Sequence, residues 1–301
     1  MTITQLETFI EIAKTMNFTT AAGNLGYGQS TVTTQIKQME DELGCLLFER
    51  LGKSIQITNE GEKLLAYAEK ILQLEREIHS EVPAGQELSG ILEIGVSESL
   101  CYNRLPHLLM EYQKTYPKVE LRLRFIDHRT FPELLKNGSL DLAYTLNPLI
   151  HDDSLTMLYK RREKLGFYAA PEFVLAGKKK ISEEDLKNTP LFLTSHDCTF
   201  RHLLLNDLEK HEIQPDIVLE TSSKEILKRF AANGLGVAFM PDMVAERETE
   251  MGELVKLSWK GSDFPIFSQV FIHKDKHVNS AMEGLLDMII ENDKDDERPE
   301  E

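Results

Sequence analysis

Residues 18–50 read FTTAAGNLGYGQSTVTTQIKQMEDELGCLLFER, and this stretch decides the fold of the first domain. Thr19 is placed to cap a short helix that ends at Gly26, and Ser30 is placed to cap the helix after it. Apolar residues spaced four and three apart predict a buried face on that second helix: Val32, Ile36, Met39 and Leu43. Two short helices joined by a glycine-containing turn are typical of a helix-turn-helix.

The opposite face of the second helix is polar, rich in hydroxyl groups and nearly free of acidic side chains. A helix with such a face can approach base edges and phosphates in the major groove. A solvated face without a partner is the alternative, because every surface helix has a polar side. We expect DNA contacts from Gln29, Ser30, Thr31, Thr33, Thr34 and Lys37.

The segments on either side complete a winged domain. Thr4 and Glu7 form a capping box that predicts an amphipathic helix at the start of the chain. After the second helix, apolar residues alternate about a turn at residues 51–54, which predicts a hairpin. Arg50 and Lys53 stand at its tip, where a wing would meet the DNA backbone or minor groove.

Composition excludes several classes of protein. The net charge is −16 and the pI about 5.1, which is the wrong sign for coating DNA through bulk charge, so any DNA contact must come from a few placed groups. Three widely spaced cysteines indicate neither a disulfide framework nor a structural zinc site, and we expect no metal and no cofactor. Without a secretion signal or an apolar stretch of membrane-spanning length, we expect a cytoplasmic protein with no membrane partner.

A long helical pattern follows from residue 59 to about residue 82. Its apolar positions keep steps of four and three residues, with Glu75 interrupting the stripe: Leu64, Ala68, Ile71, Ile78 and Val82. An apolar stripe with this spacing is typical of a helix that pairs with a second helix. The alternative is that the stripe packs against the chain's own domain. Two-fold pairing would require DNA half-sites about one helical turn apart, or a multiple of it. Residues 83–86, Pro-Ala-Gly-Gln, end the helix and form a hinge.

The second half of the chain alternates strands and helices, which predicts an α/β fold. Residues 91–125 read as a strand, a helix and a second strand, a unit that favours parallel pairing. Residues 160–165 and 264–270 are the two places where the chain could pass to a second lobe and return. Two lobes joined by two crossovers would form a ligand-binding cleft. Residues 291–301 are nearly all charged or proline, which predicts a disordered acidic tail.

The first domain resembles the DNA-binding domain of LysR-type transcriptional regulators over a long series of positions at fixed spacing: Phe18-Thr19-Thr20-Ala21-Ala22, Leu25, Gln29-Ser30-Thr31-Val32-Thr33, Ile36, Glu40, Leu43-Gly44, Leu47-Phe48-Glu49-Arg50 and Thr58-Asn59-Glu60-Gly61. The resemblance implies that Gln29, Ser30, Thr33 and Thr34 meet DNA and that Arg50 and Lys53 lie in the wing. The family often has arginine where Thr34 stands, so we expect a smaller phosphate contribution here.

The rest of the chain is also similar to LysR regulators, whose sensing half resembles periplasmic solute-binding proteins. Residues 234–241, GLGVAFMP, resemble a signature stretch of the second lobe. The expected architecture is a winged helix-turn-helix at residues 1–58 and a dimerising linker helix with hinge at 59–87. A two-lobed effector-binding domain follows at 88–290, with lobe I at 88–161 and 267–290, lobe II at 162–266, and the tail at 291–301.

In such a domain the ligand lies at the carboxyl ends of strands. Ser97 and Ser99 open a helix after the first strand and suit an anionic group, although simple helix capping is the alternative. Arg201 could grip a carboxylate, so we expect an anionic metabolite. The full set of expected effector contacts is Ser97, Ser99, His128, Arg129, Thr145, Asn147, Ser195, Cys198 and Arg201.

Three other functions fit the sequence less well than a metabolite-sensing regulator does. Ser195, His196 and Asp197 are consecutive and cannot form a catalytic relay through space, so we expect no catalytic residues and no enzyme. Cys198 could be a redox switch, as in peroxide-sensing members of the family, but the resolving cysteine that they use a short way downstream is absent. A solute-binding protein would need a signal peptide and no helix-turn-helix.

The expected mechanism begins with a small anionic metabolite that closes the two lobes of a homodimer or homotetramer. Closure would change the placement of the DNA-binding domains, the bend of the promoter DNA and the recruitment of RNA polymerase.

Overall fold

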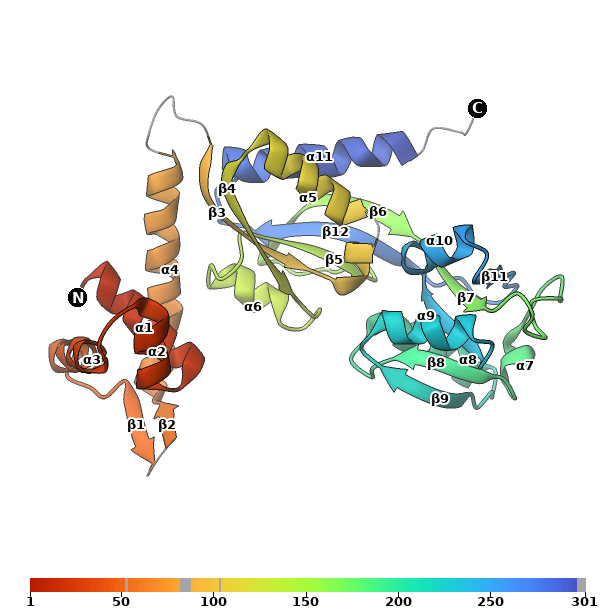
Figure 1. Cartoon of the computed structure of the whole chain (residues 1–301), viewed down its shortest axis with the longest axis horizontal. Coiled ribbons are helices and arrows are strands. Elements are labelled where there is room, and N and C mark those ends of the chain that lie inside the picture. The colour runs from red at the N-terminus through yellow and green to blue at the C-terminus, as the bar shows by residue number, and fades with distance from the viewer. Residues whose placement is uncertain (52–53, 82–87, 103, 297–301) are drawn as a thin grey trace. The chain divides into compact units, whose positions relative to one another are not determined.

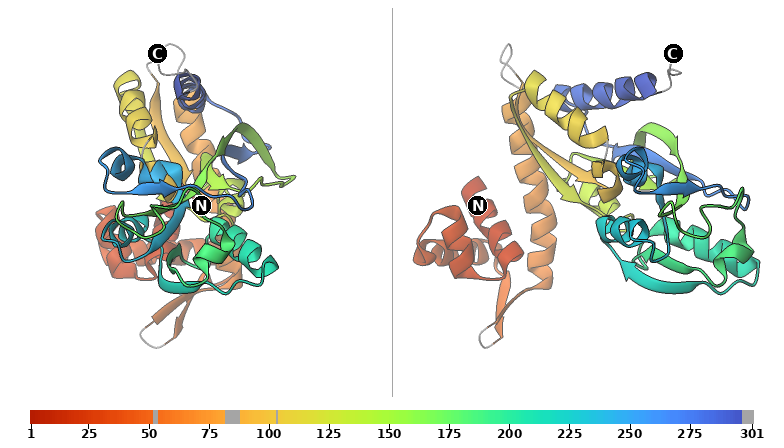
Figure 2. Two further views of the ribbon diagram at one scale, coloured as in Figure 1. Left: turned by 90° about the vertical axis from the view of Figure 1, so that its right-hand side faces the viewer. Right: turned by 45° about the vertical axis from the view of Figure 1, so that its right-hand side comes forward.

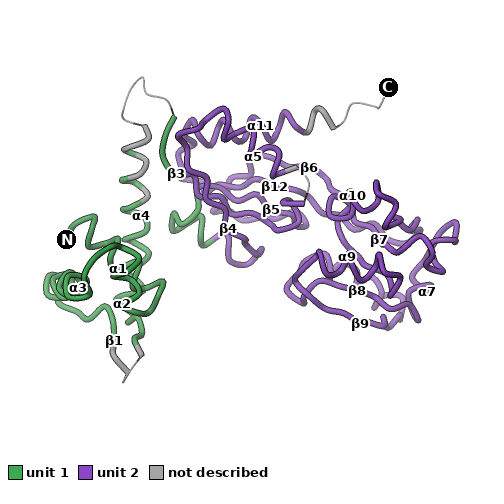
Figure 3. The backbone as a smooth tube through the Cα atoms, viewed as in Figure 1, with its two compact units in different colours: residues 1–91, 133–140 green, residues 92–132, 141–301 purple. Residues whose placement is uncertain are grey.

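The computed structural model describes residues 1–51, 54–81, 88–102 and 104–296. It divides into two compact units, residues 1–91 with 133–140 and residues 92–132 with 141–301 (Figure 3). The predicted hinge at residues 83–86 and the wing residue Lys53 lie outside the described residues.

The first unit is a winged helix-turn-helix followed by one long helix (Figure 1). Three phenylalanines form the centre of its core: the ring centroids of Phe9 and Phe48 are 5.3 Å apart, and those of Phe18 and Phe48 are 5.9 Å apart. The hydrophobic effect therefore joins the first helix, the second helix and the wing. Its elements are α1 (Ile3–Thr15), α2 (Phe18–Leu25), α3 (Gln29–Leu43), β1 (Phe48–Leu51), β2 (Ser54–Ile57) and α4 (Asn59–Glu81).

The first three helices begin two residues before the positions that the predicted caps imply, so the assignments of Thr4, Thr19 and Ser30 as caps are wrong. Thr2 caps α1 in a capping box with Gln5. Asn17 caps α2, because its carboxamide oxygen accepts from the backbone nitrogens of both Thr19 and Thr20. Gly28 precedes α3 without a side-chain cap, so the hydroxyl groups at the start of α3 are not used as caps.

The wing is fixed to the start of α4 by Thr58 and Gly61. Phe48 pairs with Ile57 across the hairpin, which confirms the predicted alternation. The Thr58 hydroxyl donates to the Leu46 carbonyl at 2.7 Å and accepts from the Gly61 nitrogen at 2.9 Å. A Cβ atom at Gly61 would lie 2.4 Å from the Leu47 carbonyl oxygen, so only glycine fits this junction.

The apolar stripe of α4 divides into two parts. Leu64 and Ala68 are buried in the core of the first unit, so packing against the chain's own domain accounts for them. A second stripe, with steps of four, three and four residues, is exposed and has the spacing of a coiled-coil seam: Tyr67, Ile71, Leu74 and Ile78.

The second unit contains two five-stranded sheets. The first has the order β4-β3-β5-β12-β6, and helices α5 and α11 lie side by side on one of its faces (Figures 1 and 2). Strands β3 and β5 are parallel, whereas β12 is antiparallel to both β5 and β6. The elements of this lobe are β3 (Ser89–Val96), η1 (Glu98–Tyr102), α5 (Arg104–Thr115), β4 (Lys118–Phe125), α6 (Phe131–Lys136), β5 (Leu142–Asn147), β6 (Leu155–Glu163), β12 (Ile266–His273) and α11 (Ser280–Asp296). Residues 89–91 of β3 and 133–136 of α6 are grouped with the first unit.

The second sheet has the order β11-β7-β10-β8-β9 and forms the other lobe. Leu227 and Ala231 of α9 are fully buried, and they belong to a core shared with Phe192 and Met240 of the sheet. The elements are β7 (Leu165–Ala169), α7 (Glu183–Leu186), β8 (Pro190–Thr194), α8 (Thr199–Lys210), β9 (Asp216–Thr221), α9 (Lys224–Ala232), β10 (Val237–Pro241), α10 (Asp242–Glu250) and β11 (Val255–Leu257).

The chain passes between the two sheets of the second unit twice. The first crossing follows β6 at Lys164, and the second precedes β12. Two details differ: the short edge strand β11 is not predicted, and α11 continues to Asp296, so residues 291–296 are helical rather than a disordered tail. None of the helices in the described residues is long and apolar enough to cross a membrane.

Candidate nucleic-acid interface and effector pocket

The surface of α3 carries the residues expected to meet DNA. Val32, Ile36 and Met39 are buried, which turns the opposite side of the helix outward, whereas Leu43, predicted on the buried face, is exposed at the end of the helix. Gln29, Ser30, Thr31, Thr34 and Lys37 are exposed, and Thr33 is half-buried. For the wing, the described residues include the backbone of Arg50 but neither its side chain nor Lys53.

Two of the three threonine hydroxyls of α3 are already used as donors. Thr33 Oγ1 donates to the Gln29 carbonyl at 2.9 Å, and Thr34 Oγ1 donates to the Ser30 carbonyl at 2.8 Å. Each hydroxyl has one proton, so these groups keep only acceptor lone pairs and a methyl group for a ligand. Thr19 Oγ1 donates to Gln29 Oε1 at 3.2 Å, which leaves the amide NH₂ of Gln29 as its free donor end.

The charge on this surface is sparse. Residues 1–58 contain four basic and six acidic side chains, and Lys37 is the only charged residue from 29 to 39. Glu40 accepts from the Leu47 nitrogen at 2.8 Å, and Glu42 pairs with the N-terminal ammonium at 2.6 Å. These two acids therefore support the entry to the wing and the start of α1.

A pocket of about 210 Å³ lies in the second unit, where loops from both lobes meet. Residues after the carboxyl ends of β3, β4 and β5 line it from one lobe, and residues around the starts of α8 and α9 line it from the other. Six expected effector contacts belong to its lining: Ser97, Ser99, His128, Asn147, Ser195 and Cys198.

Three expected effector contacts do not line this pocket. Arg129 pairs with Asp197, which is itself a lining residue. Thr145 is 1% exposed, and its hydroxyl contacts the Gln269 carbonyl. Arg201 is buried; its guanidinium donates to the Thr194 carbonyl at 2.8 Å and pairs with Glu220 at 2.7 Å. The charge of Arg201 is therefore already neutralised by its own lobe.

Three polar contacts join the lobes at the pocket. Glu98 pairs with Lys224 of the other lobe, and Arg129 pairs with Asp197. Thr199 Oγ1 donates to Asn147 Oδ1 at 2.9 Å. Lys224 is the basic residue of the lining, and sequence reasoning missed it. The signal was present, because Lys224 directly follows the hydroxyl-rich Thr221-Ser222-Ser223 at a strand-to-helix junction.

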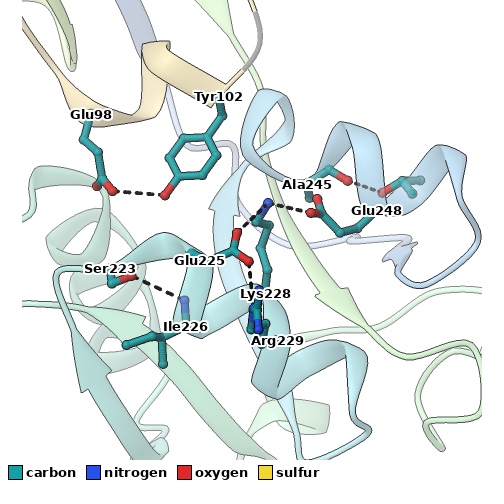
Figure 4. Close-up of polar contacts among 10 residues, drawn as sticks. Glu98, Tyr102, Ser223, Glu225, Ile226, Lys228, Arg229, Ala245 and Glu248 are labelled. Atoms are coloured by element: carbon teal, nitrogen blue, oxygen red, sulfur yellow. Dashed lines mark hydrogen bonds and ion pairs between the residues drawn. The ribbon is translucent and has the colours of Figure 1, made fainter.

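Beside the pocket, a second lysine of α9 completes a charged seam between η1, α9 and α10 (Figure 4). Lys228 Nζ lies 2.6 Å from Glu248 Oε1, 3.2 Å from Glu225 Oε2 and 5.0 Å from the centroid of the Tyr102 ring. The Tyr102 hydroxyl donates to Glu98 at 3.0 Å. Glu98 is therefore held by Tyr102 from its own lobe and by Lys224 from the other.

Two titratable groups at the pocket, Cys198 and His128, favour their neutral forms. Burial raises the pKa of the Cys198 thiol and outweighs the lowering contributed by Thr194 and Lys224. Burial likewise lowers the pKa of His128 below its usual value. This environment therefore does not favour the thiolate that a redox switch at Cys198 would need.

Two larger hollows lie near the crossovers. One of about 880 Å³ is lined by residues 162–166 and by residues from 256 to 264, and one of about 790 Å³ adjoins α10. Neither contains the polar loops at the ends of parallel strands. The smaller pocket is the better candidate, because helix starts and strand ends converge there.

Comparison with protein families matches both parts of the chain. Residues 3–62 match the family described as bacterial regulatory helix-turn-helix protein, lysR family, and residues 85–294 match the LysR substrate binding domain.

Among curated proteins, the chain is 35% identical to the uncharacterized HTH-type transcriptional regulator YwqM of Bacillus subtilis strain 168, covering 96% of this chain and 98% of that protein. It is 30% identical to the HTH-type transcriptional regulator CzcR of the same organism, over 97% and 98%. These relatives are named as regulators of transcription and not as enzymes.

Among solved structures, the fold is similar to a full-length variant of OxyR from Pseudomonas aeruginosa, with a TM-score of 0.74, 24% identity and coverage of 96% of this chain and 94% of that one. It is also similar to full-length CbnR complexed with its target DNA, with a TM-score of 0.69, 20% identity and coverage of 97% and 99%.

Proposed function

Because the chain belongs to the LysR family of bacterial transcriptional regulators, we propose that it binds promoter DNA as a symmetric oligomer and responds to a small anionic metabolite at the pocket between its lobes. The family supplies the DNA-binding and effector-binding roles. The observation that carries the proposal is the exposed hydroxyl and amide face of α3 on a winged helix-turn-helix.

The recognition helix α3 would bind DNA mainly through neutral donors, acceptors and methyl groups, with little contribution from charge. Ser30, Thr31 and the Gln29 amide supply the free donors, while Thr33 and Thr34 present methyl groups and acceptors. Threonine methyls pack well against thymine methyls in the major groove, and Lys37 adds one cation for a phosphate. The wing would contribute through Arg50 and Lys53.

Oligomerisation would use the exposed stripe of α4. Tyr67, Leu74 and Ile78 are each more than half exposed, which is unusual for apolar side chains in a row at coiled-coil spacing. Pairing these stripes in a homodimer would present two α3 helices to one duplex, and dimers could assemble further into a homotetramer.

The effector would act on the Glu98–Lys224 pair. Lys224 supplies a cation to the pocket, and Glu98 of the opposite lobe neutralises it. An anionic ligand would replace Glu98 at Lys224, which breaks one contact between the lobes and forms another through the ligand. Binding would thus shift the population of lobe arrangements and, through them, promoter bending and RNA polymerase recruitment.

Redox sensing at Cys198 is the alternative within the family. Its raised pKa keeps the thiol protonated, and the protonated form reacts slowly with oxidants. No observation at this residue favours redox sensing over ligand binding.

DNA binding is tested with the purified full-length chain on its own promoter and on random DNA of equal length. We expect preferential binding to the promoter and protection of an interrupted inverted repeat. Leu74→Glu should abolish both dimerisation, measured by light scattering, and promoter preference. Equal affinity for the two DNAs, with and without metabolites, would refute the proposal.

The effector site is tested by screening anionic metabolites for a thermal shift of the same protein. Lys224→Met should remove the shift, whereas Lys210→Met, an exposed lysine at the end of α8, should retain it. Retention of binding in Lys224→Met, or selection of cationic metabolites that Glu98→Gln abolishes, would overturn the assignment of an anionic ligand.

A further inference from the structure

Three metal-ligating side chains from two helices meet in the lobe that contains β7–β11. Glu183 opens α7, while Asp207 lies near the end of α8 and His211 caps that end. One carboxylate oxygen of each acid and one ring nitrogen of His211 lie within 4.8 Å of one another. Asp207 is eight residues beyond Thr199, so the cluster lies about 12 Å along α8 from the effector pocket.

The Asp207 carboxylate has one buried oxygen without a hydrogen-bond partner among the residues that the structure describes. Its residue is 6% exposed, and Oδ2 is buried without a hydrogen-bond partner in the described part of the chain. An ionised carboxylate out of water without a partner carries a large desolvation cost, and buried charges in proteins are paired or bind metals. The unpartnered oxygen of Asp207 is therefore a second observation, independent of the cluster, that favours a cation site here.

His211 makes a backbone contact of the kind that metal-binding histidines commonly make. Its Nδ1 lies 2.8 Å from the Asp207 backbone carbonyl oxygen. A proton on Nδ1 donated to this carbonyl leaves the lone pair on Nε2, which is the tautomer that a metal requires. The same residue, Asp207, thereby supplies both a carboxylate to the cluster and the acceptor that fixes the imidazole.

Gly261 lies close to the Glu183 carboxylate. A Cβ atom at Gly261 would lie 2.1 Å from Glu183 Oε1, so the glycine lets its loop pass directly over this carboxylate. The side chain is half-buried, whereas His211 is exposed, so solvent can reach the cluster from one direction.

We propose that Glu183, Asp207 and His211 bind one divalent transition-metal cation, with Zn²⁺ the best match. One imidazole with two carboxylates is a mixed nitrogen and oxygen set that suits Zn²⁺, and a water can complete four-coordination on the exposed side. Mg²⁺ and Ca²⁺ are disfavoured, because they take oxygen ligands. The ion ties α7 to the end of α8.

The test uses the full-length chain, stripped of metal and titrated with Zn²⁺ by calorimetry and with Co²⁺ by visible absorption. The chain has nine histidines and three cysteines, so adventitious binding is expected and the site is measured as a difference between variants. His211→Ala should lose one equivalent and weaken binding by more than about tenfold, since even outer-shell changes cost that much. His202→Ala, an exposed histidine on the same helix outside the cluster, should bind as wild type does.

Asp207→Asn supplies a second readout. In the absence of metal it should unfold at a temperature no lower than wild type, because it removes an unpartnered charge. It should also lose the rise in Tm that Zn²⁺ gives to wild type. Equal stoichiometry in wild type and His211→Ala, together with an equal Zn²⁺-induced rise in Tm for wild type and Asp207→Asn, would overturn the proposal.

Discussion

The polar face of α3 and the seam between η1, α9 and α10 use side-chain chemistry in opposite ways. On α3 the groups are exposed and almost all neutral, with Lys37 the one charged residue among those expected to meet DNA on this helix. In the seam the groups are charged and largely buried: the side chains of Lys224 and Lys228 are 11% and 6% exposed.

The difference teaches where electrostatics matter in this protein. Exposed charges are screened by salt and each contributes little to folding stability, so α3 loses little stability by having few of them. Buried charges depend on their partners, because removing one partner leaves the other desolvated and unpaired. Mutations should therefore be tolerated on α3 for stability but not in the seam.

The largest effect is expected for Lys228→Ala. Its removal leaves Glu248, whose Oε2 already has no hydrogen-bond partner, as a nearly buried unpaired charge. We expect a loss of about 3 kcal/mol in the free energy of unfolding, measured by urea denaturation. Arg229→Ala is the matched control on the same helix; its side chain is 77% exposed, and its loss should leave the midpoint nearly unchanged. Equal urea midpoints for the two variants would show that the buried lysine of the seam matters no more for stability than an exposed arginine.

Glu98→Gln should have the next largest effect, on ligand affinity. The change keeps the shape of the side chain but removes the competitor for Lys224. An anionic ligand should bind about tenfold more tightly, equivalent to ~1.4 kcal/mol, by calorimetry. Glu225→Gln, which alters the neighbouring pair with Lys228, is the control and should leave ligand affinity unchanged. Weaker binding by Glu98→Gln would instead make Glu98 a ligand contact.

Thr34→Arg should strengthen the electrostatic contribution of α3 to DNA binding. It adds one exposed cation per protomer to a surface that has few. We expect tighter binding to random DNA at low salt and a log–log salt slope steeper by about 0.9 per protomer, measured by fluorescence anisotropy. Thr34→Gln adds length without charge and should leave the slope unchanged. An unaltered slope in Thr34→Arg would place residue 34 away from phosphates.

The smallest effect concerns pH. Because burial lowers the pKa of folded His128 below its usual 6.5, the unfolded chain takes up this proton first as the solution is acidified. The contribution of His128 is therefore retained above pH 6.5 and lost as the pH falls from there toward the lowered folded value. The urea midpoint of wild type should decrease over this window more than that of His128→Gln. Parallel curves would refute the assignment.

The sequence predicts the fold well where one face of an element is buried. The spacing of Val32, Ile36 and Met39 fixes the orientation of α3, and the alternation around the wing fixes its pairing. Helix starts are predicted less well, because several polar residues near each start can cap. Asn17 caps α2 through two hydrogen bonds that depend on the local backbone, which a residue pattern does not specify.

Side-chain positions at the pocket depend on partners distant in sequence. Arg201 has the chemistry of an anion-binding residue, but its guanidinium already forms an ion pair with Glu220 of β9. Likewise, Asp207 and His211 are four residues apart on one helix, so the sequence places their side chains on the same face. Glu183 lies beside them only because the fold of this lobe brings the start of α7 near the end of α8. Strand order predicts which loops meet, but not which of their charges are already paired.

The two crossings between the lobes are neighbours within one ladder. Strands β6 and β12 pair from Leu155–His273 to Glu163–Ile266, and the Ser268 hydroxyl donates to the Glu163 carboxylate at 2.8 Å next to the point of exit. Two crossings from neighbouring, hydrogen-bonded strands have the arrangement of a hinge, and a hinge favours opening and closing over twisting and shear. We therefore expect that a molecule bound in the pocket would change mainly the angle between the two lobes.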